Sequence, residues 1–125
     1  MGRKRYFRDL LAWQKAMELV PAAYEIARAL PGVERYALAD QIRRCVISVP
    51  ANIAEGQARQ HPKDFLQFLA IARGSLAELH TLILAAHSLD SIAEGQVEPS
   101  EKLIAEVGRL LAGLSNRLKS DSQVV

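Results

Sequence analysis

Residues 41–56 read QIRRCVISVPANIAEG, and their apolar positions follow the period of an α-helix. The apolar side chains recur every three or four residues and so share one helical face: Ile42, Cys45, Val49 and Ile53. No segment of the sequence shows the alternation of a strand over a comparable length. The sequence therefore predicts an all-α protein.

The same spacing extends along the chain and predicts four helices, over about residues 9–30, 36–59, 62–89 and 99–119. Asp9 and Ser100 are expected N-caps, and Pro62 stands at a first helical position, where proline is favoured. The seams expected to face the core are Leu10, Trp13, Met17, Val20, Tyr24 and Ala27; Leu38, Ile42, Cys45, Val49 and Ile53; Phe65, Phe68, Ala72, Leu76, Leu79, Ile83 and Ala86; and Leu103, Val107, Leu110, Leu114 and Leu118. Short connections favour an antiparallel, up-down-up-down four-helix bundle that forms a single domain over residues 1–125.

Two prolines lie inside the predicted helices. Proline removes one backbone hydrogen bond from a helix interior, so a kink is expected near residues 17–21, before Pro21. For Pro50, as for Pro21, the sequence leaves open whether the helix is kinked or interrupted.

Composition places the charge of the chain unevenly. The 125 residues are half hydrophobic, which suits one domain with its own core, and sixteen Lys and Arg against fourteen Asp and Glu give a net charge of +2. Four of the basic residues lie within the arm of residues 1–8, so the rest of the chain is close to neutral. The basic character therefore belongs mainly to this arm.

The single cysteine and the absence of long apolar runs bear on location. Cys45 has no intramolecular disulfide partner, which suits a reducing cytoplasm. The N-terminus lacks the apolar region of a signal peptide, and no apolar run approaches the roughly 20 residues of a membrane span. We expect a cytoplasmic protein with no membrane partner.

The second predicted helix carries a further face of mostly small apolar residues: Ile47, Ala51, Ala54 and Ala58. In a four-helix bundle only one side of each helix faces the core. The further face predicts a neighbour from outside the bundle, and therefore a homo-oligomer.

A polar stripe accompanies these two faces, at steps of three and four residues: Gln41, Arg44, Ser48, Asn52, Glu55 and Arg59. Two interpretations remain open. The stripe is either a solvated face or a buried or interfacial network of hydrogen bonds.

The third predicted helix offers a complement to this stripe in Arg73, Gly74, Ser75 and Glu78. A glycine in mid-helix costs about 1 kcal/mol relative to alanine, so Gly74 suggests that another backbone passes close by. Glu78 could then pair with Arg43 or Arg44, and Arg73 with Glu55; the alternative is that these charges are solvated and Gly74 is merely tolerated.

Catalytic and metal-binding patterns find little support. No Glu-x-x-His motif of a carboxylate-bridged metal bundle occurs, and His80 and His87 would be about 10 Å apart along a helix axis. Cys45 is expected to be an inert core thiol. We expect no enzymatic activity, metal, cofactor or small-molecule substrate; the enzymatic alternative is a general base at Glu55 or Glu78.

Nucleic acid is the alternative partner that the basic residues suggest. Arg3, Lys4, Arg5 and Arg8 are interleaved with two aromatic residues and could neutralise phosphates while the rings stack on bases, with Arg43, Arg44, Arg59 and Lys63 as secondary contacts. The alternative is a solubilising arm whose aromatic rings pack on the bundle.

Three blocks of sequence resemble a known family, named after proteins encoded in intervening sequences of bacterial large-subunit ribosomal RNA genes. They are Phe7 through Leu38, with DL at 9–10 and WQKA at 13–16; QIRR at 41–44 through SVPANIAEG at 48–56; and IARGS at 71–75 with EL at 78–79. The resemblance implies a left-handed antiparallel bundle and ring-like homo-oligomers, typically of five subunits. It also implies a relation to the accessory protein of diversity-generating retroelements, which engages a reverse transcriptase and nucleic acid through a basic barrel surface.

Together these observations predict a non-enzymatic protein that self-assembles into a ring. The alternative is an RNA- or DNA-binding accessory protein that uses basic residues on the assembled oligomer.

Overall fold

The structure is a computed structural model that describes residues 6–123, with side chains over 6–33 and 36–121. A short 3-10 helix, η1 (Phe7–Asp9), precedes four α-helices: α1 (Leu11–Ala29), α2 (Glu34–Ala58), α3 (Pro62–Ser88) and α4 (Glu94–Gln123). No strand occurs in this part of the chain. The all-α prediction is confirmed.

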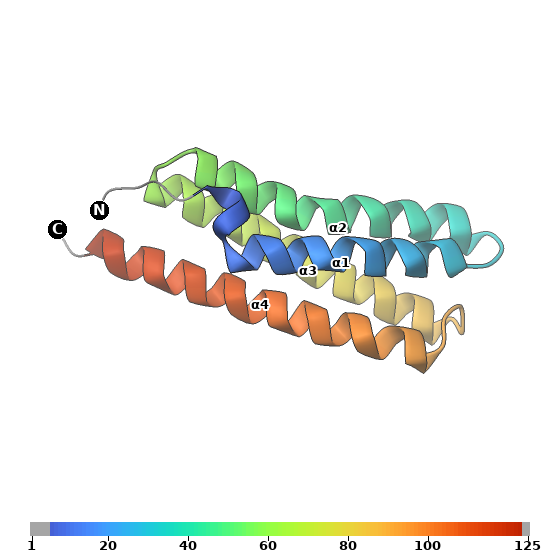
Figure 1. Cartoon of the computed structure of the whole chain (residues 1–125). Coiled ribbons are helices and arrows are strands. Elements are labelled where there is room, and N and C mark those ends of the chain that lie inside the picture. The colour runs from blue at the N-terminus through green and yellow to red at the C-terminus, as the bar shows by residue number, and fades with distance from the viewer. Residues whose placement is uncertain (1–5, 124–125) are drawn as a thin grey trace.

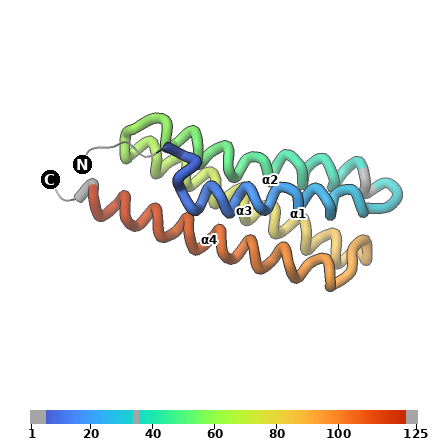
Figure 2. Tube along the Cα trace, viewed as in Figure 1, coloured from blue at the N-terminus to red at the C-terminus, as the bar shows by residue number. Residues whose placement is uncertain are grey.

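The four helices run alternately up and down (Figure 1). Each packs against two neighbours: α1 and α3 both contact α2 and α4, so the helices form a ring around one core. The start of α1, the connection from α2 to α3 and the end of α4 lie at one end of the bundle, as the trace shows (Figure 2). The antiparallel four-helix bundle is therefore confirmed.

The core seams of α2 and α3 agree with the sequence prediction. Ile42, Cys45, Val49 and Ile53 are buried in α2, and Leu38 is half-buried beside them. In α3 the buried members are Ala72, Leu76, Leu79, Ile83 and Ala86, with Phe65 and Phe68 half-buried. In both helices the large apolar side chains recur at helical spacing on one side. Their positions therefore identify the buried face from the sequence.

The predicted core seam of α1 is correct only at its two ends, where Leu10 and Ala27 are buried. The buried face consists of Ala12, Ala16, Leu19, Ala23, Ile26 and Ala27, whereas Met17 is exposed and Trp13, Val20 and Tyr24 are half-buried at the edge of the core. The prediction followed the bulky residues. The bundle instead turns the alanines of α1 inward, because small side chains let helices approach closely.

Two helix starts also differ from the prediction. Asp9 ends η1, and the N-cap of α1 is Leu10, whose side chain is buried. Helix α4 begins at Glu94, so Ser100 is no cap but a buried residue whose hydroxyl donates to the carbonyls of Gln96 and Val97. The helix also passes through Pro99, its sixth residue, although a proline at that position removes the backbone hydrogen bond to Gly95.

Neither internal proline interrupts its helix. α1 continues past Pro21, which is exposed, and α2 continues past Pro50, which is buried. The helical spacing of the side chains before each proline therefore continues after it.

Helices α2 and α3 approach closely at Gly56. A Cβ atom at this glycine would lie 2.7 Å from Cβ of Phe68 and 2.9 Å from Cδ1 of Phe65, so only glycine fits without displacement. At Gly74, by contrast, a Cβ would meet nothing within 4 Å. The backbone approach expected at Gly74 is thus made at Gly56 instead.

Helix α3 has the length and apolar composition of a membrane span, with a mean hydropathy of 1.4 over its most apolar 18 residues. A core helix passes the same test, and Leu69, Leu79 and Ile83 are fully buried in the bundle. Yet only 28% of that apolar window is buried. The bundle alone therefore leaves apolar surface uncovered on α3.

Candidate interaction surface

The outer side of α2 lies between α1 and α3, and its register against α1 is fixed by one contact. The guanidinium carbon of Arg43 lies 5.9 Å from the ring centroid of Tyr24. In an antiparallel pair this register brings Ile47 level with Val20, and Ala54 level with Trp13. The further face of α2 and the misassigned seam of α1 therefore lie side by side on the surface.

We call this surface the α1–α2 face and define it by Trp13, Met17, Val20, Tyr24, Ile47, Ala51, Ala54 and Ala58. Its central side chains remain open to solvent, since Ile47 is 44% and Met17 41% exposed. Ala51 and Ala58 are exposed as well. Apolar and small residues on adjoining helices make this a surface that a partner helix could approach closely.

The other flank of α2, toward α3, carries the polar stripe. Ser48 Oγ lies 2.8 Å from Ser75 Oγ, and Asn52 Nδ2 donates to the carbonyl of Ser48 at 2.8 Å and to its hydroxyl at 3.0 Å. All three side chains are half-buried. They form one hydrogen-bonded network that joins α2 to α3.

A hollow of about 280 Å³ opens beside this network, lined by Gln41, Arg44, Cys45, Ser48, Ser75 and Glu78. The structure thus brings four of the sequence-predicted site residues together. Ser75, which belongs to the complement expected on the third helix, lines the hollow with them.

The ion pairs expected between α2 and α3 are not formed among the described residues. Arg43 instead lies 3.5 Å from Asp40, and Glu55 lies 3.2 Å from Arg59, each within α2. These partners lie one helical turn away on the same helix, so the side chains reach them without crossing to α3. Arg44 and Glu78 consequently remain on the exposed rim of the hollow.

Arg73 and Gly74 lie apart from the network. Both are exposed, and Arg73 precedes Ser75 by two residues, a rotation of about 200° around the helix axis. Since Ser75 faces α2, Arg73 faces away from it. Within one chain Arg73 therefore does not pair with Glu55, which contacts Arg59 instead.

Cys45 is a structural thiol. Burial raises its pKa to about 11, and the nearby carboxylate of Glu78 adds to the increase. Its Sγ donates to the carbonyl of Ser75 at 2.9 Å. A thiol held protonated in this way is a poor nucleophile at neutral pH.

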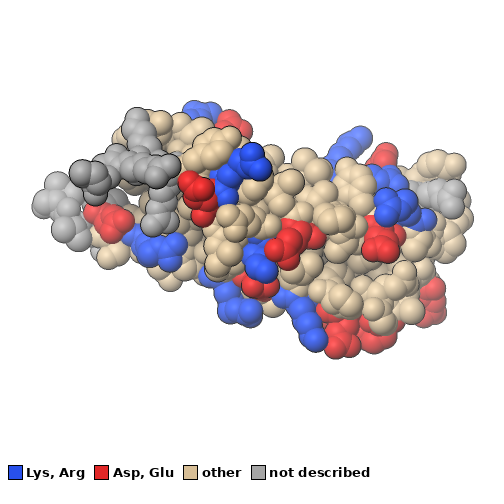
Figure 3. Space-filling view, viewed as in Figure 1, with Lys and Arg blue, Asp and Glu red and all other residues tan. Residues whose placement is uncertain are grey.

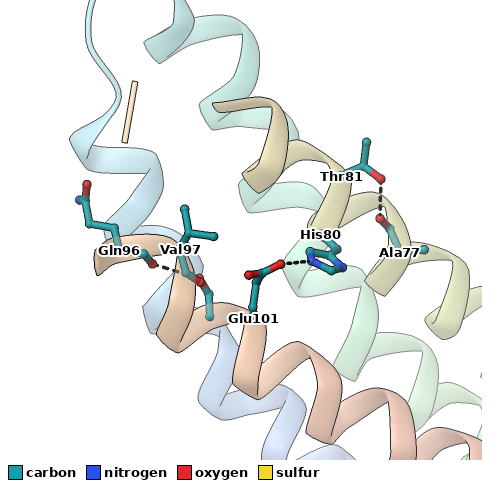
Figure 4. Close-up of polar contacts among 7 residues, drawn as sticks. Ala77, His80, Thr81, Gln96, Val97 and Glu101 are labelled. Atoms are coloured by element: carbon teal, nitrogen blue, oxygen red, sulfur yellow. Dashed lines mark hydrogen bonds and ion pairs between the residues drawn. The ribbon is translucent and has the colours of Figure 1, made fainter. Parts of the chain in front are cut away.

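The two histidines of α3 each face a glutamate of α4. His80 Nε2 lies 2.6 Å from Glu101 Oε2, and the two side chains point toward one another in Figure 4. His87 Nε2 lies 3.8 Å from Glu94 Oε1. No group of three or more His, Cys, Asp or Glu positioned to hold a metal ion occurs in the described residues.

The basic residues considered for nucleic acid do not form one surface within the described part of the chain. Arg3, Lys4 and Arg5 lie outside the described residues, while Arg8, Arg59 and Lys63 share the end of the bundle where η1 meets α2. Arg59 is engaged there by Glu55 and by the ring of Phe68, whose centroid is 5.0 Å away. Arg43 lies sixteen residues earlier on α2, about 24 Å along the axis.

Charges on the visible side of the molecule are mixed in sign. Lys and Arg alternate with Asp and Glu over most of this side (Figure 3). The clearest segregation is the group of acidic residues near the start of α4, at the lower right of the view. A continuous basic surface is not seen on this side.

Comparison with known proteins places this bundle in a family. A crystal structure from Bacteroides thetaiotaomicron, of a protein with unknown function from the S23 ribosomal protein family, superposes with a TM-score of 0.77 over 84% of this chain and 98% of that one, at 23% identity. No curated protein matches the sequence. The family model of the 23S rRNA-intervening sequence protein matches residues 8–113. This match spans most of the chain, including α1 to α3 and the first two thirds of α4, and the protein therefore belongs to the 23S rRNA-intervening sequence protein family.

Proposed function

We propose that this protein is a non-enzymatic interaction module that assembles with copies of itself into a ring in the cytoplasm. The observation that carries the proposal is the α1–α2 face, which is apolar, made partly of small residues and exposed in the single chain at Met17, Ile47, Ala51 and Ala58. Full burial of an isoleucine or methionine side chain stabilises by about 1.5–3 kcal/mol, and Ile47 and Met17 have a large part of that still to gain.

Ring closure follows from the kind of contact. If the α1–α2 face of one copy meets a different surface of the next, the contact is heterologous, and such contacts close into rings when the rotation allows it. The uncovered apolar surface of α3, on the opposite side of α2 from α1, offers such a second surface. The family resemblance supports five subunits.

The test is the solution mass at micromolar concentration, by sedimentation equilibrium or light scattering. Ile47→Glu should reduce the assembly to monomers, because it places a charge in the centre of the α1–α2 face. The matched control is Leu11→Glu, because Leu11 is 52% exposed, close to the 44% of Ile47, and belongs neither to the α1–α2 face nor to α3. Equal masses for wild type and Ile47→Glu would exclude this face as the assembly surface.

Binding of RNA or DNA is a second candidate, supported by the shared position of Arg8, Arg59 and Lys63 at one end of the bundle. Affinity for single-stranded RNA should then fall steeply with salt and drop on deletion of residues 2–8. Lys63→Glu should weaken binding, whereas Lys102→Glu, on the solvent side of α4 near the other end of the bundle, should not. Salt-independent binding, or none, would eliminate this function.

A further inference from the structure

The hollow between α2 and α3 carries two charges of opposite sign that do not form an ion pair with each other. Arg44 of α2 and Glu78 of α3 both line it. Neither side chain forms an ion pair with any other described residue, whereas Arg43, the neighbour of Arg44, lies 3.5 Å from Asp40. The hollow therefore presents a cation on the α2 side and a carboxylate on the α3 side.

The carboxylate of Glu78 lies over the inner wall of the hollow, which the buried Cys45 forms. Burial, and after it the negative charge of Glu78, raise the pKa of the Cys45 thiol to about 11. The carboxylate must be close to the thiol to have this effect. A positively charged N–H donor is the partner that best stabilises a carboxylate in such a place.

The inner wall also has one hydroxyl proton available. Ser48 and Ser75 share one hydrogen bond, which uses one of their two hydroxyl protons. Asn52 donates to the hydroxyl oxygen of Ser48, so it leaves the second proton without an acceptor among the described residues. A ligand oxygen in the hollow can accept this proton together with the N–H groups of Arg44.

The two charges restrict the chemistry of a ligand. A phosphate or a nucleic acid would be repelled by Glu78, and a metal cation would be repelled by Arg44. A molecule that carries an anionic and a cationic group together satisfies both side chains. The volume of about 280 Å³ lies just below the range of about 300–1,000 Å³ typical of pockets for drug-sized ligands, so the ligand is small.

We propose that the hollow binds a free α-amino acid in its zwitterionic form. The carboxylate of the amino acid accepts hydrogen bonds from Arg44 and from the serine pair, and its ammonium group donates to Glu78. The amide of Gln41, which also lines the hollow, can donate to and accept from a polar side chain of the ligand. The amino acid is bound without being transformed.

This site goes beyond the self-association proposed above and does not depend on it. All the side chains that line the hollow belong to one chain. Binding is therefore expected whether the protein is a ring or a monomer.

NMR titration of the full chain with each common L-amino acid, up to about 10 mM to cover weak binding, tests the proposal. At least one amino acid should shift the backbone amide signals of residues 41–48 and 75–78, and the shifts should saturate. If no amino acid produces saturable shifts at these residues, the proposal is overturned.

Two derivatives of the tightest-binding amino acid then test the role of each charge. The N-acetyl derivative lacks the ammonium group and the amide derivative lacks the carboxylate, so each should bind at least about tenfold more weakly. Glu78→Gln should abolish the preference for the amino acid over its N-acetyl derivative. Arg44→Gln should likewise abolish the preference over the amide derivative. Variants that keep these preferences would overturn the assignment of the two side chains.

The matched control variants are Glu98→Gln and Arg109→Gln, which remove the same charges from the exposed side of α4. Both should bind the amino acid with the affinity of the wild type. If the control variants lost as much affinity as Glu78→Gln and Arg44→Gln, the net charge of the protein and not the hollow would govern binding, and the proposal would be overturned.

Discussion

Helix α2 meets its two neighbours in different ways. Against α3 the contact is close and polar at its edge: Gly56 accommodates Phe65 and Phe68, and Ser48, Asn52 and Ser75 share hydrogen bonds. Against α1 the edge is apolar and open, with Ile47 and Met17 partly in solvent. The α2–α3 edge is complete within one chain, whereas the α1–α2 edge is the kind of surface that a further chain completes.

The largest expected difference in stability is between substitutions on the buried side and on the exposed side of α2. Ile53→Ala should lower the free energy of unfolding by about 2–5 kcal/mol, because Ile53 is fully buried. Ile47→Ala should change it by about 0.5 kcal/mol or less at concentrations where the protein is monomeric. Urea denaturation compares the two; similar losses would mean that Ile47 belongs to the core.

The next effect concerns the close approach of α2 and α3. Gly56→Ala should destabilise the bundle by about 1–3 kcal/mol, because the new methyl group would overlap Phe68 near its backbone. Gly74→Ala, in open space, should stabilise by up to about 1 kcal/mol through helix propensity. If Gly56→Ala also stabilised the protein in thermal or urea denaturation, the close approach would be disproved.

Because of Cys45, the stability of the folded protein should depend on pH. Its pKa is raised to about 11 from 9.0, so the folded state keeps its proton over a range where the unfolded thiol ionises. Stability from this site is fully present below pH 9 and should be lost as the pH rises toward 11. Measured against Cys45→Ala, whose other groups titrate alike, the wild type should lose additional stability between pH 9 and 11; parallel curves would contradict the raised pKa.

The smallest effect tests the hydroxyl pair. Ser48→Ala and Ser75→Ala should each cost about 0.5–1.5 kcal/mol, and the double variant less than the sum, because the two hydroxyl groups bond to each other. A double-mutant cycle on urea midpoints measures this coupling. Strict additivity would show that the two serines act independently.

Much of the fold could be predicted from the periodicity of the apolar residues. The exceptions lie in α1 and α4. The α2 and α3 seams follow from large apolar residues at one spacing. In α1 the bulky residues Met17 and Tyr24 lie beside a face of alanines, and hydrophobicity alone favours the wrong face. Helix α4 was expected to begin late because Gly95 and Pro99 resemble a linker, yet the helix includes both residues.

The candidate site was predictable in composition but not in geometry. Spacing placed Gln41, Arg44 and Ser48 on one stripe of α2. It could not show that Ser75 would bond to that stripe, or that Arg73 would face away, because both depend on the rotation of α3. The role of Gly56 likewise depends on which residues of α3 lie opposite it.

The central claim is that the bundle is a subunit, and the mass of the wild-type protein in solution tests it most directly. Sedimentation equilibrium at micromolar concentration should give a multiple of the 13.8 kDa chain mass, with all chains in one defined assembly. A mass of 13.8 kDa throughout that range would contradict the account, because the α1–α2 face would then remain exposed in the finished molecule.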